Sequence, residues 1–113
     1  MELVDLTREI YDSANRLKNG SSEIFKLAKE KAEKERDYRR ALAVEIMRLK
    51  GEKMAATLIP DLARGQTADL KFERDLADAR WTTARESLDA IKSQMSGLQT
   101  VLRYQTEVPN GRG

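Results

Sequence analysis

The sequence contains no cysteine and no histidine. The absence of cysteine excludes disulfides, thiolate nucleophiles and cysteine-ligated zinc, and the absence of histidine removes the usual general base and the commonest metal ligand. A catalytic or metal site would have to be built from carboxylates, lysines and hydroxyls alone. We therefore expect a protein that is not an enzyme and that uses no cofactor or metal.

Proline, aromatic residues and long apolar runs are also scarce. Two prolines and 5% aromatic residues, beside 40% apolar and 35% charged residues, are typical of long-helix proteins rather than of β-sandwiches or barrels. No apolar run is long enough to span a membrane, and the first twenty residues carry acidic side chains where a signal peptide would be apolar. These features predict an all-α, cytoplasmic protein without membrane contact.

Charge of one sign is not in large excess either. The net charge is +2 over 113 residues, which is not the polybasic pattern of strong non-specific nucleic-acid binding. From Glu30 to Arg40 nearly every residue is charged, with both signs interspersed. This run is either a solvated helix face or a stripe for interaction with a partner.

Apolar spacing then predicts where the helices lie. The first helix is expected at about 2–18, ended by Asn19-Gly20, and the second at about 22–50 with Ser21 or Ser22 as its cap. The stripe of the first helix is Leu3, Leu6, Ile10, Ala14 and Leu17. The seam expected along the second helix is Phe25, Ala28, Ala32, Glu35, Arg39, Leu42, Ile46 and Leu49.

The clearest pattern in the chain predicts a third helix at about 68–105. Its stripe alternates steps of four and three residues, the signature of a helix packed against another along its length. The stripe consists of Leu70, Arg74, Ala77, Trp81, Ala84, Leu88, Ile91, Met95, Leu98 and Leu102. Most of this stripe is predicted to pack between helices, together with three residues of the second helix. The predicted packing residues are Leu42, Ile46, Leu49, Leu70, Ala77, Trp81, Leu88, Ile91, Met95, Leu98 and Leu102. For Trp81 an exposed, partner-binding position remains open.

The segment between the second and third helices reads as a structured corner. Gly51 can end the second helix, Thr57 can cap a short helix at about 57–64, and Thr67 can cap the third helix. Leu58, Ile59 and Leu62 would then plug the end of the hairpin. Alternatively, the corner is a contact surface for a partner, made of Lys50, Lys53, Leu58, Ile59, Arg64 and Lys71.

These elements predict a single domain at 1–107, followed by a flexible tail at 108–113. The expected architecture is a long, coiled-coil-like antiparallel hairpin with a short corner helix and an N-terminal helix. A connection centred near Ile59 would place Trp81 beside Tyr38. The N-terminal helix either folds back to give a three-helix bundle or pairs with another chain in a dimeric bundle, and the dimer is favoured.

The region from Tyr38 to Val108 contains ALAVEIMRL, ATLIPDLARG, LKFERDLA and SGLQT. With these elements it resembles a group of small, mostly uncharacterised helical proteins of phages and prophages of Gram-positive bacteria. The genes of that group lie near those for single-strand annealing recombinases and single-strand-binding proteins. The resemblance brings no catalytic residues with it.

Residues and resemblance together predict a non-enzymatic phage accessory protein in the host cytoplasm. It would act by binding a protein of DNA recombination or replication. Two alternatives stay open. The first is a host-directed inhibitor, such as an anti-CRISPR or other anti-defence protein. The second is weak binding of single-stranded DNA, against which few aromatic platforms and a small net charge argue.

Overall fold

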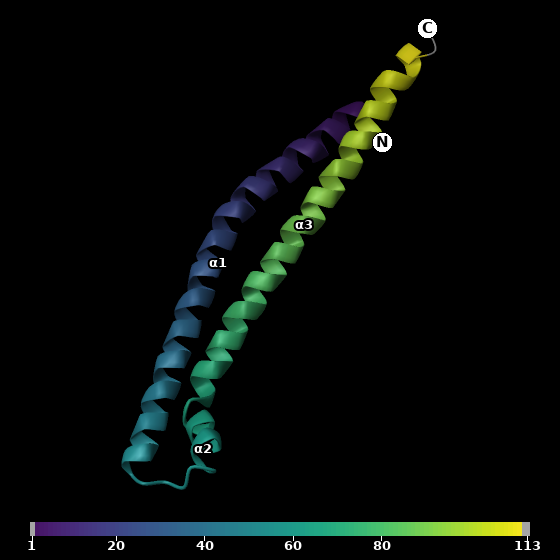
Figure 1. Ribbon diagram of the computed structural model, residues 1–113. Coiled ribbons are helices and arrows are strands. Elements are labelled where there is room, and N and C mark those ends of the chain that lie inside the picture. Colours follow the sequence, from purple (N-terminus) through teal and green to yellow (C-terminus); the bar gives the residue numbers. More distant parts are fainter. Residues whose placement is uncertain (1, 112–113) are drawn as a thin grey trace. The chain divides into compact units, whose positions relative to one another are not determined.

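The structure is a computed structural model that describes residues 2–111. It consists of helices α1 (Leu3–Gly51), α2 (Ile59–Gln66) and α3 (Ala68–Gly111), and these described residues form no strand (Figure 1). The all-α class is confirmed, and α1 and α3 form a helical hairpin with α2 at the connection. The expected tail at 108–113 begins inside α3, and residues 112 and 113 lie outside the described part.

The chain divides into two compact units. The terminal unit contains Met1–Phe25 and Thr83–Gly113, and the corner unit contains Lys26–Thr82. Each unit therefore holds one part of α1 and one part of α3, and α2 belongs to the corner unit.

In the terminal unit, α1 and α3 are paired through faces that repeat at steps of four and three residues. Leu6 and Ser13 are buried on the α1 face. The half-buried residues beside them on α1 are Ile10, Leu17, Gly20 and Ile24. The half-buried residues of α3 in this unit are Ala84, Leu88, Ile91, Met95, Leu98 and Leu102. The seam is thus aliphatic and rich in small residues.

The helix break expected at Asn19-Gly20 does not occur, because α1 continues from Leu3 to Gly51. Gly20 is not at positive φ, and a Cβ added there would overlap the side chain of Leu88. Ser21 does not act as a cap, since its Oγ donates to the carbonyl of Leu17 at 2.8 Å. The glycine therefore serves close helix packing, and the prediction of a separate N-terminal helix was wrong.

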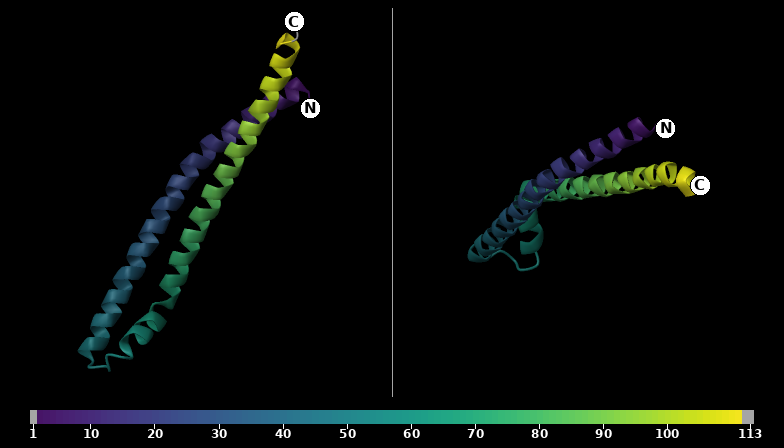
Figure 2. Two further views of the ribbon diagram at one scale, coloured as in Figure 1. Left: turned by 45° about the vertical axis from the view of Figure 1, so that its right-hand side comes forward. Right: turned by 90° about the horizontal axis from the view of Figure 1, so that it is seen from above.

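In the corner unit the apolar core is a small cluster where α1 ends. Leu49, Ile59 and Ala63 are buried in it, and Leu42, Ile46 and Met54 pack against them. Helix α2 supplies Ile59 and Ala63, which one turn brings onto the same face. Packing of that face on α1 holds α2 at the end of the hairpin, as all views show (Figures 1 and 2).

The caps expected in the corner differ from those observed. Leu58 rather than Thr57 precedes α2, and it makes no side-chain cap. The buried hydroxyl of Thr67 donates back to the carbonyl of Ala63 at 2.8 Å instead of capping α3. Pro60 lies in the first turn of α2, where its missing N–H is not needed. The apolar face of α2, more than its caps, therefore fixes this short helix.

The register of the hairpin in the corner unit also differs from the expected one. Arg74 lies over the ring of Tyr38 at 4.6 Å, and Lys31 lies over Trp81 at 4.1 Å. Trp81 is therefore not beside Tyr38. Helix α2 packs against α1, so its residues occupy the corner. The two cation–ring contacts are centred at Ala56 rather than near Ile59.

The seam expected along residues 25–49 of α1 was wrong in its first half. Phe25, Ala32 and Arg39 are exposed, whereas the buried Tyr38 lies under Arg74 of α3. The half-buried residues that continue the spacing of the terminal unit toward Tyr38 are Leu27, Lys31 and Lys34. Charged residues occupy this face because α3 offers them opposite charges.

Candidate functional site

Of the six residues predicted to form a contact surface at the corner, five are exposed in the structure. The exposed ones are Lys50, Lys53, Leu58, Arg64 and Lys71. Ile59 is only 6% exposed and belongs to the core cluster, so its assignment to the surface was wrong. Leu62, expected to plug the hairpin, is instead 41% exposed. We call Leu58, Leu62, Lys50, Lys53, Arg64 and Lys71 together the corner surface.

The backbone holds the corner surface in a defined conformation. The N–H of Lys53 donates to the carbonyl of Lys50 at 3.0 Å, and the N–H of Met54 donates to that of Leu49 at 3.1 Å. Lys53 has φ 60°. This pair of bonds around a left-handed residue is the Schellman ending of a helix. Met54 packs on the core cluster that contains Leu49, an apolar contact that frequently accompanies this motif. Helix α1 thus ends at Gly51, as expected from the sequence, and Lys53 is the left-handed residue that follows it.

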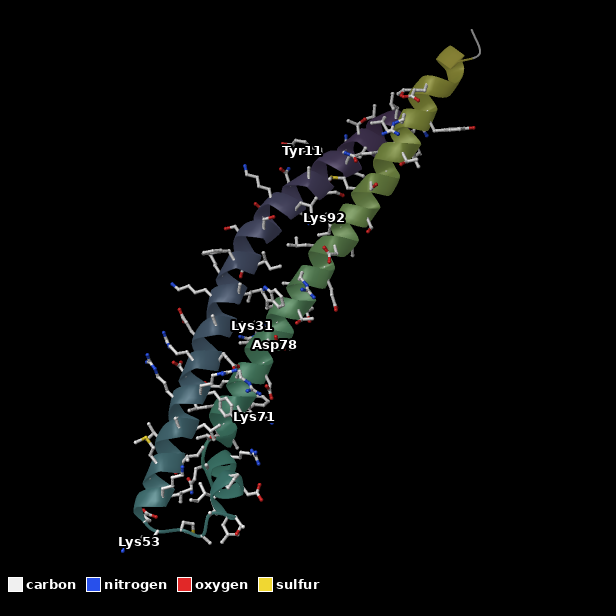
Figure 3. All side chains as sticks on the ribbon, viewed as in Figure 1. Tyr11, Lys31, Lys53, Lys71, Asp78 and Lys92 are labelled. Carbon is white, nitrogen blue, oxygen red and sulfur yellow. The ribbon has the colours of Figure 1, made fainter. Side chains whose placement is uncertain are left out.

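Lys53 is an unusual residue for that position. Glycine adopts positive φ without a steric penalty, and other residues do so at an energetic cost. Lys53 is the only non-glycine residue with positive φ in the described part of the chain. Its side chain is exposed at the very end of the hairpin (Figure 3). The fold alone does not explain a lysine here.

The cations of the corner surface differ in their pairing. Arg64 pairs with Asp61 at 3.2 Å, and both side chains are exposed. No ion pair is found for Lys50, Lys53 or Lys71 among residues 2–111. These three ammonium groups are therefore free to meet acidic groups of a partner.

Between α1 and α3, the corner unit contains a second cluster of polar side chains. Four ion pairs cross from helix to helix: Lys31 with Asp78 at 3.2 Å, Arg80 with Glu30 at 3.4 Å, Lys34 with Glu73 at 3.5 Å, and Arg74 with Glu35 at 3.5 Å. Figure 3 shows Lys31 and Asp78 meeting between the two helices. We call these four pairs, with Tyr38 and Trp81, the charged seam.

Arg74 is held at the charged seam by several groups. Its hydrogen bond to Asp75 is the largest cause that raises the pKa of its guanidinium, and the charges of Asp75 and Glu35 act in the same direction. Arginine is already ionised at any ordinary pH. Arg74 therefore remains a cation over Tyr38, and its role is to pair the helices.

Beside the charged seam lies an open groove of about 480 Å³. Its lining residues are Ala28, Lys31, Ala32, Glu35, Arg39 and Trp81. Trp81 is half-buried and Lys31 covers its ring. At this groove Glu35 pairs with Arg39 at 2.6 Å and with Arg74 at 3.5 Å.

Three acidic residues in the first turns of α3 likewise pair with cations. Glu73 pairs with Lys34, Asp75 with Arg74 at 2.9 Å, and Asp78 with Lys31. Within residues 2–111 no three acidic, cysteine or histidine side chains are grouped so that they could hold a metal ion.

The side chains predicted to pack between helices all lie on inward faces of the helices. Leu49 and Ala77 are buried. The half-buried ones are Leu42, Ile46, Leu70, Trp81, Leu88, Ile91, Met95, Leu98 and Leu102. The residues missed by sequence reasoning belong to α1. On α1, a stripe from Leu6 through Ile24 to Leu27 has the alternating spacing of four and three residues that identified α3. Continued along the helix, this spacing predicts that Lys31, Lys34 and Tyr38 face α3.

No family model, no curated protein and no solved structure matches the chain. In the described part of the chain, no helix combines the length and the apolar character needed to cross a membrane.

Proposed function

We propose that the protein acts without catalysis, by binding another protein through the corner surface. The expected partner is a component of DNA recombination or replication, and the setting is the cytoplasm of a host cell that carries the phage. The observation that carries the proposal is Lys53, a lysine at a helix ending that favours glycine. Departures from local structural preference are expected at functional sites.

The apolar part of the corner surface supports the same proposal. Leu58 is 52% exposed, although it adjoins the buried Ile59. Leu58 and Leu62 therefore leave apolar area in contact with water on a helix whose other face is already packed. Exposed leucines among free lysines match a partner surface with an apolar centre and an acidic rim.

Replacement of Lys53 by glycine separates binding from stability. Lys53→Gly should stabilise the fold by about 0.5 to 1 kcal/mol, because relief of the left-handed strain exceeds the entropy that glycine adds to the unfolded chain, and it should weaken partner binding. Thermal unfolding followed by circular dichroism measures the first effect, and the amount of partner retained on the immobilised protein measures the second. A variant that is more stable and binds as well as wild type would contradict the role of Lys53.

The apolar contact is tested with Leu58→Ser/Leu62→Ser. The matched control is Val44→Ser/Met47→Ser, which changes two exposed residues of α1 in the same unit. Partners are captured from infected and from uninfected cells. We expect capture by wild type and by the control, and loss with the corner variant. Equal capture by all three would remove the corner surface from the proposal.

The origin of the captured partner decides between the leading proposal and the first alternative. A phage-encoded or host protein of recombination or replication supports the accessory role. A protein of host defence instead supports a host-directed inhibitor, such as an anti-CRISPR protein, on the same fold.

A second candidate, weak binding of single-stranded DNA, is favoured by one detail. Phe72 is exposed next to the free Lys71, and an aromatic ring beside a cation can stack on a base. A mobility shift at low salt that disappears in Phe72→Ala and in Lys53→Glu/Arg64→Glu would support this candidate. The absence of any shift at low salt would remove it.

A further inference from the structure

A face of α1 in the terminal unit is not used by the contacts within that unit. It consists of six exposed residues that repeat at steps of four and three: Thr7, Tyr11, Ala14, Lys18, Ser21 and Phe25. We call these residues the outer stripe. Tyr11 and Phe25 are 67% and 73% exposed, and Figure 3 shows Tyr11 on the outer side of α1. The same spacing, on the inner face, is what pairs α1 with α3.

The exposed area of the chain leaves room for a helix partner on such a face. The protein exposes 8436 Å², whereas a compact monomer of its mass, 12.9 kDa, exposes about 6,300 Å². The excess of about 2,100 Å² is larger than the roughly 800 Å² that each partner contributes to a standard interface. The excess exposed area is therefore larger than the area that the chain would bury against a second copy in a standard interface.

We propose that the outer stripe is a homodimer interface, in which α1 of one chain pairs antiparallel with α1 of a second chain. The order of spacings carries this inference. From Thr7 to Phe25 the steps are four, three, four, three, four, so they read the same in both directions. When two copies lie antiparallel, with the twofold axis between Ala14 and Lys18, each spacing along one outer stripe faces an equal spacing along the other.

Side-chain sizes fit this register as well as the spacings do. Phe25 of one copy faces Thr7 of the other, Tyr11 faces Ser21, and Lys18 faces Ala14. A large residue meets a small one in every layer, which is the arrangement that lets side chains of two helices interdigitate.

The structure contains a hollow that suits one of these large residues. Val4, Thr7, Arg8 and Tyr11 line, with Leu3, an open and mostly apolar pocket of about 470 Å³. Positions spaced by three, four and seven residues form the hole into which a residue of a facing helix inserts. In the proposed register Phe25 of the second copy lies at this level, where Arg8 and Tyr11 can contact its ring.

The polar groups of the outer stripe are compatible with burial. The hydroxyl of Thr7 donates to the carbonyl of Leu3 at 2.9 Å, and that of Ser21 donates to Leu17. Neither needs water once covered. The stem of Lys18 can cover Ala14 while its ammonium reaches the rim. A lysine at such a position fixes the register of a helix pair and lowers its affinity.

The first test is the oligomeric state of the full chain, measured by sedimentation equilibrium over the micromolar range. We expect a reversible dimer. Phe25→Glu should weaken it by at least tenfold, whereas Met47→Glu, equally exposed in the corner unit, should leave it unchanged. Circular dichroism confirms that both variants fold. A wild type that is monomeric throughout, or a dimer that Phe25→Glu does not weaken, would overturn the proposal.

The second test fixes the direction of the pairing. Because the chain has no cysteine, a Tyr11→Cys chain and a Ser21→Cys chain each carry a single thiol. Oxidation of the mixture should give the crosslinked heterodimer in clear excess over either homodimer, since positions 11 and 21 face each other only between antiparallel copies. Efficient crosslinking of Tyr11→Cys with itself would indicate a parallel pair and would contradict the register.

Discussion

The two units pair α1 with α3 by different chemistry. In the terminal unit the seam is aliphatic, and Gly20 gives Leu88 the space to approach α1. In the corner unit ion pairs cross the seam, and the buried apolar residues are the cluster around Leu49 together with Tyr38 and Ala77. Exposed ion pairs contribute little stability individually, but they distinguish one register from another. The apolar contacts therefore provide the stability of the hairpin, and the charged seam selects the register in which α1 pairs with α3.

Removal of the apolar cluster should have the largest effect in the corner unit. Leu49→Ala removes a side chain that is 4% exposed and should lower the free energy of unfolding by about 2 to 5 kcal/mol. Met47→Ala, two residues away and exposed, serves as the control and should change it little. Urea unfolding followed by circular dichroism measures both. Similar effects of the two variants would contradict the packing of the corner.

Trp81 tests the aromatic part of the charged seam. Because it is half-buried, Trp81→Ala should lower stability by about 1.5 to 2.5 kcal/mol, roughly half the loss for a fully buried aromatic residue. Phe72→Ala removes an exposed ring from the same helix and should have a much smaller effect. The midpoints of thermal unfolding compare the two, and an unchanged midpoint for Trp81→Ala would place this side chain on the surface.

Gly20 and Gly97 of the terminal unit test its close packing. A Cβ at Gly97 meets no atom within 4 Å, so Gly97→Ala should stabilise the protein by about 0.5 to 1 kcal/mol through helix propensity. Gly20→Ala should gain less, since the new methyl group displaces the side chain of Leu88. Equal gains in chemical unfolding would show that α1 and α3 do not approach closely at Gly20.

The smallest effect is expected for a single ion pair of the charged seam. In a double-mutant cycle of Lys31→Met and Asp78→Asn, the coupling energy should be about 0.2 to 1 kcal/mol and should decrease with added salt. The side chains of Lys31 and Asp78 are 40% and 55% exposed, which limits the coupling. A coupling of several kcal/mol that is insensitive to salt would show that this pair contributes stability as well as register.

The sequence predicted α3 well because its stripe is almost wholly apolar and its spacing is unambiguous. It misled at Gly20, because a glycine that ends a helix and a glycine that admits a neighbouring side chain look alike in one sequence. It also misled along 25–39 of α1, where two stripes with the same spacing compete. The apolar Phe25 and Ala32 lie outside the seam, and the charged Lys31 and Lys34 lie inside it.

The corner was predicted only in part, because the orientation of its apolar side chains depends on packing between helices. The lysines and Arg64 were placed on the surface from their position between the long helices. Leu58 was expected either to plug the hairpin or to lie on the surface, and it is exposed. Local sequence gave no sign that Ile59 rather than Leu62 turns inward, since that depends on how α2 packs against Leu49. The same packing shifts the register, because residues of α2 fold into the corner instead of extending the two long helices.

The register of the charged seam is the claim on which the comparison of the two units depends, and crosslinking measures it directly. In a chain without native cysteine, Lys34→Cys/Glu73→Cys and Tyr38→Cys/Arg80→Cys are treated with a short bifunctional thiol reagent. The observed ion pair of Lys34 with Glu73 predicts fast intramolecular crosslinking of the first pair and slow reaction of the second. Faster crosslinking between positions 38 and 80 would contradict the account.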